Sequence, residues 1–132
     1  MLLHLLPADD WSRSARVGAL EPASLATEGF VHCCADDDQL LAVANRFYRN
    51  LQGPVLAVAL DESRFEAPVR WEAPAHPDGT PAAANEPRFP HVYGAIPTAA
   101  AIVVRELTRD PDGSYAGFTP GSGASAIRTP PG

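Results

Sequence analysis

The stretch DDDQLLAVANRFYRNLQGPVLAVAL at residues 36–60 decides the fold class of this chain. Its first part predicts an amphipathic helix between Asp36 and Gly53, because apolar side chains recur there at three- and four-residue steps. These apolar positions are Leu40, Val43, Ala44, Phe47 and Leu51. Three aspartates begin the segment, where the helix dipole favours negative charge. The run Val55–Leu60 that follows is apolar on both faces, which is typical of a central strand.

Shorter elements lie on both sides of this helix and strand. The apolar run Leu2–Leu6 predicts a first strand. A short helix is expected from Asp9 or Asp10, as its cap, to about Val17. Residues 21–28, rich in proline, serine and threonine, predict a loop. Further strands or strand edges are expected at residues 29–34, 69–72, 88–94 and 100–107. Because strands outnumber helices, the sequence predicts an α+β fold: a mainly antiparallel, split or curved β-sheet with one long and one short helix.

Length and composition limit what the chain can be. Its 132 residues fit one domain, and 45% hydrophobic residues is close to the globular average. No apolar run approaches the roughly 18 residues that cross a bilayer. The N-terminus lacks the cationic start of a secretory signal. Two adjacent cysteines, Cys33 and Cys34, cannot form a useful disulfide framework, which favours a reducing compartment. We therefore expect a soluble, cytoplasmic protein.

The charge balance excludes some classes of partner. Acidic side chains exceed basic ones and give a formal net charge of −6. Such a charge disfavours nucleic acid and anionic membranes, which attract basic surfaces. A small molecule is the expected partner, and the sequence makes no prediction of the oligomeric state.

Proline and glycine divide the chain. They make up nine of the 24 residues in 109–132, where hydrophobic periodicity is absent. The sequence therefore predicts one domain at residues 1–108 and a Pro/Gly-rich C-terminal tail at 109–132, which could pack on the domain through Tyr115, Phe118 or Ile127 but could not fold alone. The irregular loop from Pro74 to about Pro87 has a length that often covers a site.

Three of the four histidines lie in apolar surroundings. His4, His32 and His91 fall within predicted strands or strand edges, and His76 falls in the long loop. A buried imidazole needs partners for its ring nitrogens. Strand alternation puts Phe30 and His32 on one face of their segment. It likewise puts Phe89, His91 and Tyr93 on one face of theirs. Aromatic walls beside imidazoles predict a pocket for a planar ring.

Other interpretations of these residues remain open. Each histidine could instead be a structural residue that is hydrogen-bonded to the backbone. Three histidines could hold zinc with an open fourth position, and Cys33 or Cys34 could join them, although no His-x-x-x-His or Cys-x-x-Cys pair is present. Cys33 is a weak candidate nucleophile, because it and His32 point to opposite faces of a strand.

Several further polar residues are candidates. Arg46 on the long helix could reach a phosphate or carboxylate, although an exposed arginine is usually only solvated. Glu72 could act as a base or ribose ligand, or could be the solvent side of an alternating strand. The remaining candidates are Ser24, Thr27, Glu28, Asn45, Trp71 and Glu86. No GxGxxG, Walker loop or nucleophile elbow occurs, which excludes nucleotide binding by those motifs.

Four segments together resemble a known family. They are SLATEGFVHC at residues 24–33, VANRFY at 43–48, VRWE at 69–72 and FPHVYG at 89–94. With these motifs, residues 1–108 resemble the small bacterial proteins catalogued as domain of unknown function nine hundred and fifty-two. That family has no assigned reaction. The resemblance implies a fold related to the ADP-ribosyltransferases, which clamp NAD in the cleft of a split β-sheet.

The resemblance also implies roles for individual residues. In the similar RNA 2′-phosphotransferase branch, a histidine on the first strand and another in a Val-His-Leu-Ser-like segment contact the dinucleotide. His4 and His32 match these places, although two cysteines replace Leu-Ser. His91 and Tyr93 stand where the third motif is expected. The usual catalytic glutamate has no secure counterpart, since Glu86 is only nearby.

These observations lead to one expectation and two alternatives. We expect a His-lined cleft that binds NAD, a related nucleotide or a small metabolite. The ligand contacts fall to His4, His32, Ser24, Thr27 and Arg46. If the protein is an enzyme, ADP-ribosyl transfer or N-glycosidic cleavage is the expected class of reaction, with His91, His32 and Tyr93 as its catalytic residues and no metal. The alternatives are a non-enzymatic binding or accessory protein and a metal-dependent hydrolase.

Overall fold

The computed structural model describes residues 1–74 and 86–123. The strands in this part of the chain are β1 (Leu2–Pro7), β2 (Ala19–Leu20), β3 (Val31–His32), β4 (Val55–Leu60), β5 (Val69–Glu72), β6 (Phe89–Val92), β7 (Ile96–Pro97), β8 (Ala101–Arg109), β9 (Tyr115–Phe118) and β10 (Ser122–Gly123). The helices are α1 (Ala8–Val17), α2 (Ala23–Thr27) and α3 (Asp37–Phe47), with short 3-10 turns η1 (Glu62–Arg64) and η2 (Thr98–Ala100).

The largest sheet has the strand order β1-β4-β8-β10, and β9 pairs with β8 as well. All its described pairings are antiparallel, with His4 opposite Val58 in the β1–β4 register. Every residue of β4 is buried, as its two-sided apolar pattern predicts. This strand therefore forms the centre of the fold.

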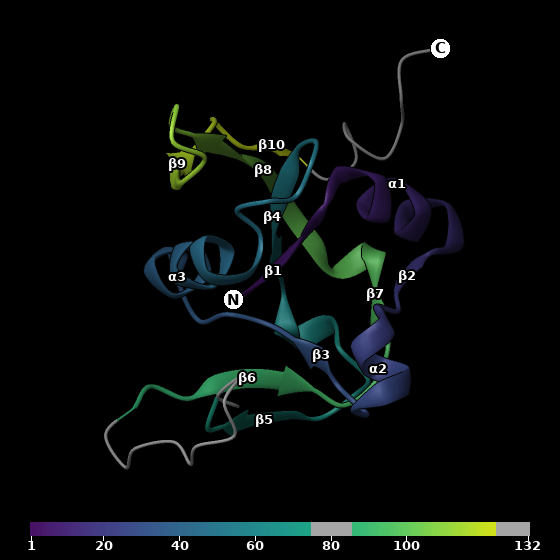
Figure 1. The fold of residues 1–132 in the computed structure, drawn as a ribbon. Coiled ribbons are helices and arrows are strands. Elements are labelled where there is room, and N and C mark those ends of the chain that lie inside the picture. The colour runs from purple at the N-terminus through teal and green to yellow at the C-terminus, as the bar shows by residue number, and fades with distance from the viewer. Residues whose placement is uncertain (75–85, 124–132) are drawn as a thin grey trace.

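Two smaller sheets complete the structure. One joins β3, β6 and β5, and the other joins β2 and β7. An isolated bridge links the three-stranded sheet to the large one: Leu3 and Cys34 exchange backbone hydrogen bonds of 2.9 and 2.7 Å. The sheets are thus connected near the start of β1 and separate beyond it, with β5 and β6 apart from the β1–β4–β8 sheet in Figure 1.

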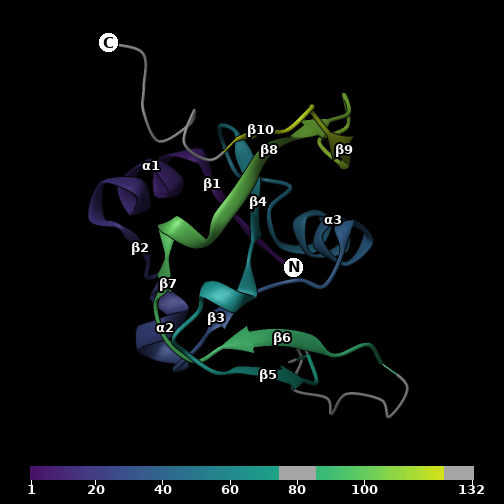
Figure 2. The same cartoon turned by 180° about the vertical axis from the view of Figure 1, so that it is seen from behind.

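Helices cover both faces of the large sheet. Leu40 and Ala44 of α3 pack in one apolar cluster, against the face of β1 that carries Leu3 and Leu5. Trp11 of α1, fully buried, packs in a second cluster on the opposite face. Both views show α3 and α1 on opposite sides of β1 and β4 (Figures 1 and 2). The prediction of an α+β fold with mainly antiparallel strands is confirmed.

The long helix ends earlier than its apolar stripe suggests. Asp36 caps α3 by accepting a hydrogen bond from the Gln39 N–H at 2.8 Å, but the helix ends at Phe47 rather than near Gly53. Beyond Phe47, three backbone carbonyls accept hydrogen bonds from a side chain. Arg109 donates to the carbonyls of Leu51, Arg49 and Gly53, at 2.6, 3.4 and 3.4 Å. Because this arginine is distant in sequence, local periodicity could not predict it.

Two predictions near the N-terminus need correction. The short helix ends at Val17, and Gly18, whose φ of +94° suits glycine, is its C-cap. Its N-cap is Pro7 and not Asp9 or Asp10. The segment expected to be a loop contains a helix that was not predicted, α2. With five residues and no buried side chain, α2 has no apolar periodicity that could have revealed it.

Residues 109–123, which the sequence places in the C-terminal tail, form strands that pack on the rest of the structure. β8 continues through Arg109, and both β9 and β10 pair with it. Tyr115 is buried in the cluster beneath α3. Its backbone N–H and C=O bond to the Asn45 side chain, at 2.7 and 3.0 Å. Residues 124–132 and most of the loop predicted at 74–87, including His76, lie outside the described residues. None of the described helices is long and apolar enough to cross a membrane.

Candidate functional site

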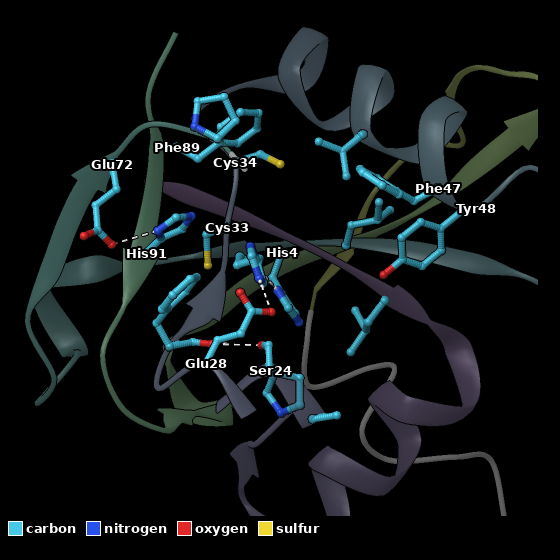
Figure 3. Close-up of a pocket in the computed structure, with 18 of the residues that line it drawn as sticks. His4, Ser24, Glu28, Cys33, Cys34, Phe47, Tyr48, Glu72, Phe89 and His91 are labelled. Carbon is cyan, nitrogen blue, oxygen red and sulfur yellow. Dashed lines mark hydrogen bonds and ion pairs between the residues drawn. The ribbon is translucent and has the colours of Figure 1, made fainter. Parts of the chain in front are cut away.

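A cavity of about 730 Å³ lies between the large sheet and the three-stranded sheet. Its walls come from β1, α2, β3, α3, β5 and β6. Figure 3 shows His4 near the middle of the cavity, Glu72 and His91 on one side, and Phe47 and Tyr48 on the other. The site thus forms where β1 and the β3–β6–β5 sheet separate beyond the Leu3–Cys34 bridge.

Strand register brings the aromatic side chains together. His32 on β3 lies opposite His91 on β6, and their ring centroids are 5.2 Å apart. Phe30 stacks on His91 at 4.1 Å with an interplanar angle of 19°. It also contacts His32 edge-on at 4.8 Å and Tyr93 at 5.2 Å. The shared faces predicted from alternation are confirmed, and they form one aromatic wall of the cavity.

A carboxylate holds the outer end of this wall. Glu72 on β5 lies diagonally across the strand pair from His91, since its direct partner in the register is Phe89. Its Oε1 is 2.9 Å from His91 Nδ1, and the Tyr93 hydroxyl donates to the same oxygen. The hydrogen bonds from Tyr93 and His91 lower the pKa of Glu72. The bond between Tyr93 and Glu72 raises the pKa of Tyr93. Glu72 is therefore an anion at neutral pH.

This contact fixes the tautomer of His91. An ionised carboxylate only accepts hydrogen bonds, so Nδ1 of His91 must carry the proton. In the neutral ring, Nε2 is then an acceptor. The His91 side chain is 8% exposed, and Figure 3 shows its second nitrogen on the side of the ring away from Glu72. The arrangement is that of a base oriented by a carboxylate.

His4 is a neutral imidazole in the cavity. It is buried on β1, and its Nδ1 donates to the His32 carbonyl at 2.7 Å. Burial lowers its pKa, which the backbone hydrogen bond only partly offsets. The ring therefore stays uncharged at neutral pH and has an acceptor at Nε2. The hydrogen bond to the backbone explains why an imidazole is tolerated within an apolar strand, because it satisfies one ring nitrogen.

A tight turn positions the remaining wall. Gly29 has a φ of +91°, a conformation that favours glycine, and this turn leads α2 into β3. The Ser24 hydroxyl donates to the Phe30 carbonyl at 2.8 Å. The Glu28 carboxylate, at the residue before Gly29, lies 3.2 Å from His32 Nε2. The turn therefore places a hydroxyl, a carboxylate and an imidazole at one end of the cavity.

The cysteines line the cavity but are not reactive. Cys33 and Cys34 are both buried, with 2% and 5% of their surface exposed. Burial raises the pKa of Cys33 far above its usual range and that of Cys34 to about 12. The thiolate, which is the nucleophilic form, is therefore absent at neutral pH. These side chains serve as apolar lining.

The structure gathers most, but not all, of the residues singled out in the sequence. His4, Ser24, His32, His91 and Tyr93 all line the cavity. Two do not. Thr27 is exposed on α2 and bonds to the Ala23 carbonyl. Arg46 is exposed on α3, with its guanidinium 5.5 Å from the Phe47 ring. Neighbouring residues of a helix point in different directions, so closeness in sequence to a cavity residue did not predict whether Thr27 or Arg46 lines the cavity.

Glu72 is the residue whose importance the sequence understated. The alternation of residues 69–72 allowed either a solvent-facing or a pocket-facing carboxylate. The pairing of β5 with β6, which local sequence does not reveal, decides between them. Within residues 1–74 and 86–123, no group of three or more His, Cys, Asp or Glu side chains is arranged to hold a metal ion. The zinc alternative therefore finds no ligand set in the described part of the chain.

Solved structures of one protein share this fold. The crystal structure of protein CC0527 from Caulobacter crescentus is 23% identical, with a TM-score of 0.69. The match covers 87% of this chain and 92% of that one. The solution NMR structure of CC0527 matches with a TM-score of 0.64 at 22% identity, over 86% of this chain and 89% of that one. At this level of identity the likeness establishes the fold alone. No curated protein matches the chain significantly.

The family model covers most of the sequence. It is described as Protein of unknown function (DUF952) and matches residues 5–104. That range contains the cavity residues from Leu5 to Tyr93, and all four motifs quoted above. The chain therefore belongs to the DUF952 family of proteins of unknown function.

Proposed function

We propose that the cavity binds a planar nitrogen heterocycle carried on ribose, as in NAD, a related nucleotide or a nucleoside. The observation that carries this proposal is the stacked pair of Phe30 and His91, 4.1 Å apart and nearly parallel, on the wall of the cavity. Aromatic side chains of this kind attract other planar rings, which stack on them with an offset. The cavity volume is also in the range of pockets that bind small molecules. The separated antiparallel sheets around the cavity support a relationship to the ADP-ribosyltransferase fold.

The polar groups suit N-glycosidic cleavage or ADP-ribosyl transfer. In such a reaction, the bond between the ring nitrogen and ribose C1′ breaks, and its electron pair goes to the ring nitrogen. A water molecule, or an acceptor hydroxyl in transfer, bonds to C1′ and gives its proton to His91 Nε2. Glu72 holds the opposite nitrogen of His91 and stabilises the imidazolium that forms. His4, His32 and Ser24 are assigned to the ribose and its substituents.

Carboxylate charge also suits the transition state. Cleavage at C1′ develops positive charge on the ribose, as in glycoside hydrolysis. Glu72 and Glu28 both line the cavity. An anion fixed beside a developing positive charge lowers the barrier, because it needs no reorganisation during the reaction. We assign this role to Glu72, the carboxylate hydrogen-bonded to His91.

The experiment is incubation of the protein with NAD, nicotinamide mononucleotide and nicotinamide riboside. Free nicotinamide is followed by chromatography, and ligand binding by the shift in melting temperature. We expect release of nicotinamide from at least one compound, and a rate at least about 100-fold lower in Glu72→Gln. Glu62→Gln is the control, since the Glu62 side chain is not part of the cavity lining and its carboxylate contacts the N-terminal ammonium at 3.4 Å.

The outcomes separate the alternatives. A rise in melting temperature without turnover would favour a non-enzymatic binding protein that uses the same cavity. No release and no thermal shift with any of the three compounds would reject the proposal.

A further inference from the structure

The ionisable side chains that line the cavity have an acidic bias. Asp10, Glu28 and Glu72 contribute three carboxylates. None of the described lining residues is arginine or lysine, and the whole sequence contains no lysine. Among the described residues, the arginines next to lining residues are not part of the lining itself. Arg70 packs on the Tyr93 ring at 4.9 Å, and Arg46 lies beside Phe47.

The His4 imidazole does not offset this bias, because burial lowers its pKa and keeps the ring neutral. His91 donates to Glu72 from Nδ1, so a neutral His91 has only an acceptor left for a ligand. Of the three carboxylates, Asp10 forms an ion pair with Arg13, and Glu28 contacts His32. Glu72 receives hydrogen bonds from His91 and Tyr93, and Arg70, which is not part of the lining, acts on it only as a nearby charge. The described lining therefore holds three carboxylates and no guanidinium.

Helix α1 does not supply an anion site to compensate. The N-terminus of α1 reaches the cavity through Pro7 and Asp10. A helix N-terminus attracts phosphate through its free N–H groups and its dipole. Here the first turn carries Asp9 and Asp10, so carboxylates already occupy the region where a phosphate would benefit. A phosphate placed in this cavity would meet like charge.

A cationic ring has the opposite fit. A pyridinium ring stacked on Phe30 or His91 would lie beside an aromatic face and near the Glu72 anion. Both contacts favour positive charge on the ring. The same carboxylates that repel phosphate therefore attract the heterocycle.

We propose that the cavity selects a cationic heteroaromatic riboside without phosphate, a pyridinium nucleoside, over the corresponding mononucleotide and dinucleotide. This inference rests on the function proposed above and narrows its class of substrate. It also predicts that positive charge on the ring strengthens binding even when the ring carries no ribose.

Titration calorimetry at low ionic strength, where screening is weak, tests the order of affinities. The probes are nicotinamide riboside, nicotinamide mononucleotide and NAD. We expect nicotinamide riboside to bind at least about tenfold more tightly than the two phosphorylated compounds. A second pair isolates ring charge: cationic 1-methylnicotinamide should bind more tightly than neutral nicotinamide.

Two variants test the electrostatic cause. Glu28→Gln removes one lining charge while keeping a side chain that can contact His32. It should reduce the ratio of the affinity for nicotinamide riboside to that for nicotinamide mononucleotide by about threefold to tenfold. Glu62→Gln is a matched control, because its side chain is 46% exposed against 48% for Glu28 and lies outside the lining. The control should leave the ratio unchanged.

Each result has a distinct meaning. If mononucleotide or NAD binds as tightly as the riboside, the phosphate-free class is wrong while ring binding stands. An unchanged ratio in Glu28→Gln, or equal affinity for charged and neutral nicotinamides, would overturn the electrostatic argument. If none of the probes binds, the proposed function itself fails, and this inference with it.

Discussion

Replacement of Tyr115 tests whether the C-terminal segment belongs to the folded core. Only 3% of Tyr115 is exposed, and it packs in the apolar cluster beneath α3. A buried aromatic side chain removes about 150–250 Å² from water. At about 25 cal/mol per Å² this is worth about 4–6 kcal/mol, and truncation of buried aromatics to alanine costs about 3–5 kcal/mol in practice. We therefore expect Tyr115→Ala to lower the free energy of unfolding by about 4 kcal/mol.

Two further variants divide this effect into packing and hydrogen bonding. Tyr115→Phe keeps the ring and loses only the 2.9 Å bond from its hydroxyl to the Tyr48 carbonyl, so it should cost about 1 kcal/mol. Asn45→Ala removes both hydrogen bonds to the Tyr115 backbone and should cost about 2 kcal/mol. Ile102→Ala, at a β8 position that is 42% exposed, is the control and should cost less than about 1 kcal/mol.

The assay is urea unfolding followed by tryptophan fluorescence, since Trp11 is fully buried and becomes exposed on unfolding. The order of costs should be Tyr115→Ala, Asn45→Ala, Tyr115→Phe and Ile102→Ala. A cost below about 1 kcal/mol for Tyr115→Ala would refute the reasoning, because it would mean that β9 detaches without loss to the core.

Three other predictions follow from burial and hydrogen bonding. Burial lowers the pKa of His4, so below about pH 6.5 the unfolded chain binds a proton that the folded chain resists. Stability should therefore fall as the pH drops through this range, and less steeply in His4→Gln, as measured by urea midpoints at pH 7.5 and 5. With the pKa of Cys34 raised to about 12 and that of Cys33 higher still, both thiols should react with a disulfide reagent at pH 8 far more slowly in buffer than in urea; rapid labelling in buffer would contradict their burial. Arg109→Ala should lower the free energy of unfolding by about 1 kcal/mol, because carbonyls after α3 lose their donor; an unchanged urea midpoint would speak against this contact.

Periodic segments were predicted well from the sequence because their signal is local. The apolar stripe of α3 and the two-sided apolar run of β4 each reflect burial within one element. Alternation likewise predicted which of Phe30, His32, His91 and Tyr93 share a face. Short or interrupted elements escaped prediction. α2 is too short to show a period, and β9 and β10 are strands of four and two residues in a segment rich in proline and glycine.

The amino-acid sequence by itself determined the class of fold, the two principal elements and the set of imidazoles and aromatic rings available for a site. Tertiary structure alone decided which of these residues meet. The pairing of β5 with β6 turned Glu72 toward His91, and the position of α3 left Arg46 outside the cavity. The physical reason is that periodicity records which face of an element is buried, whereas contacts between elements depend on register and packing across long separations in sequence.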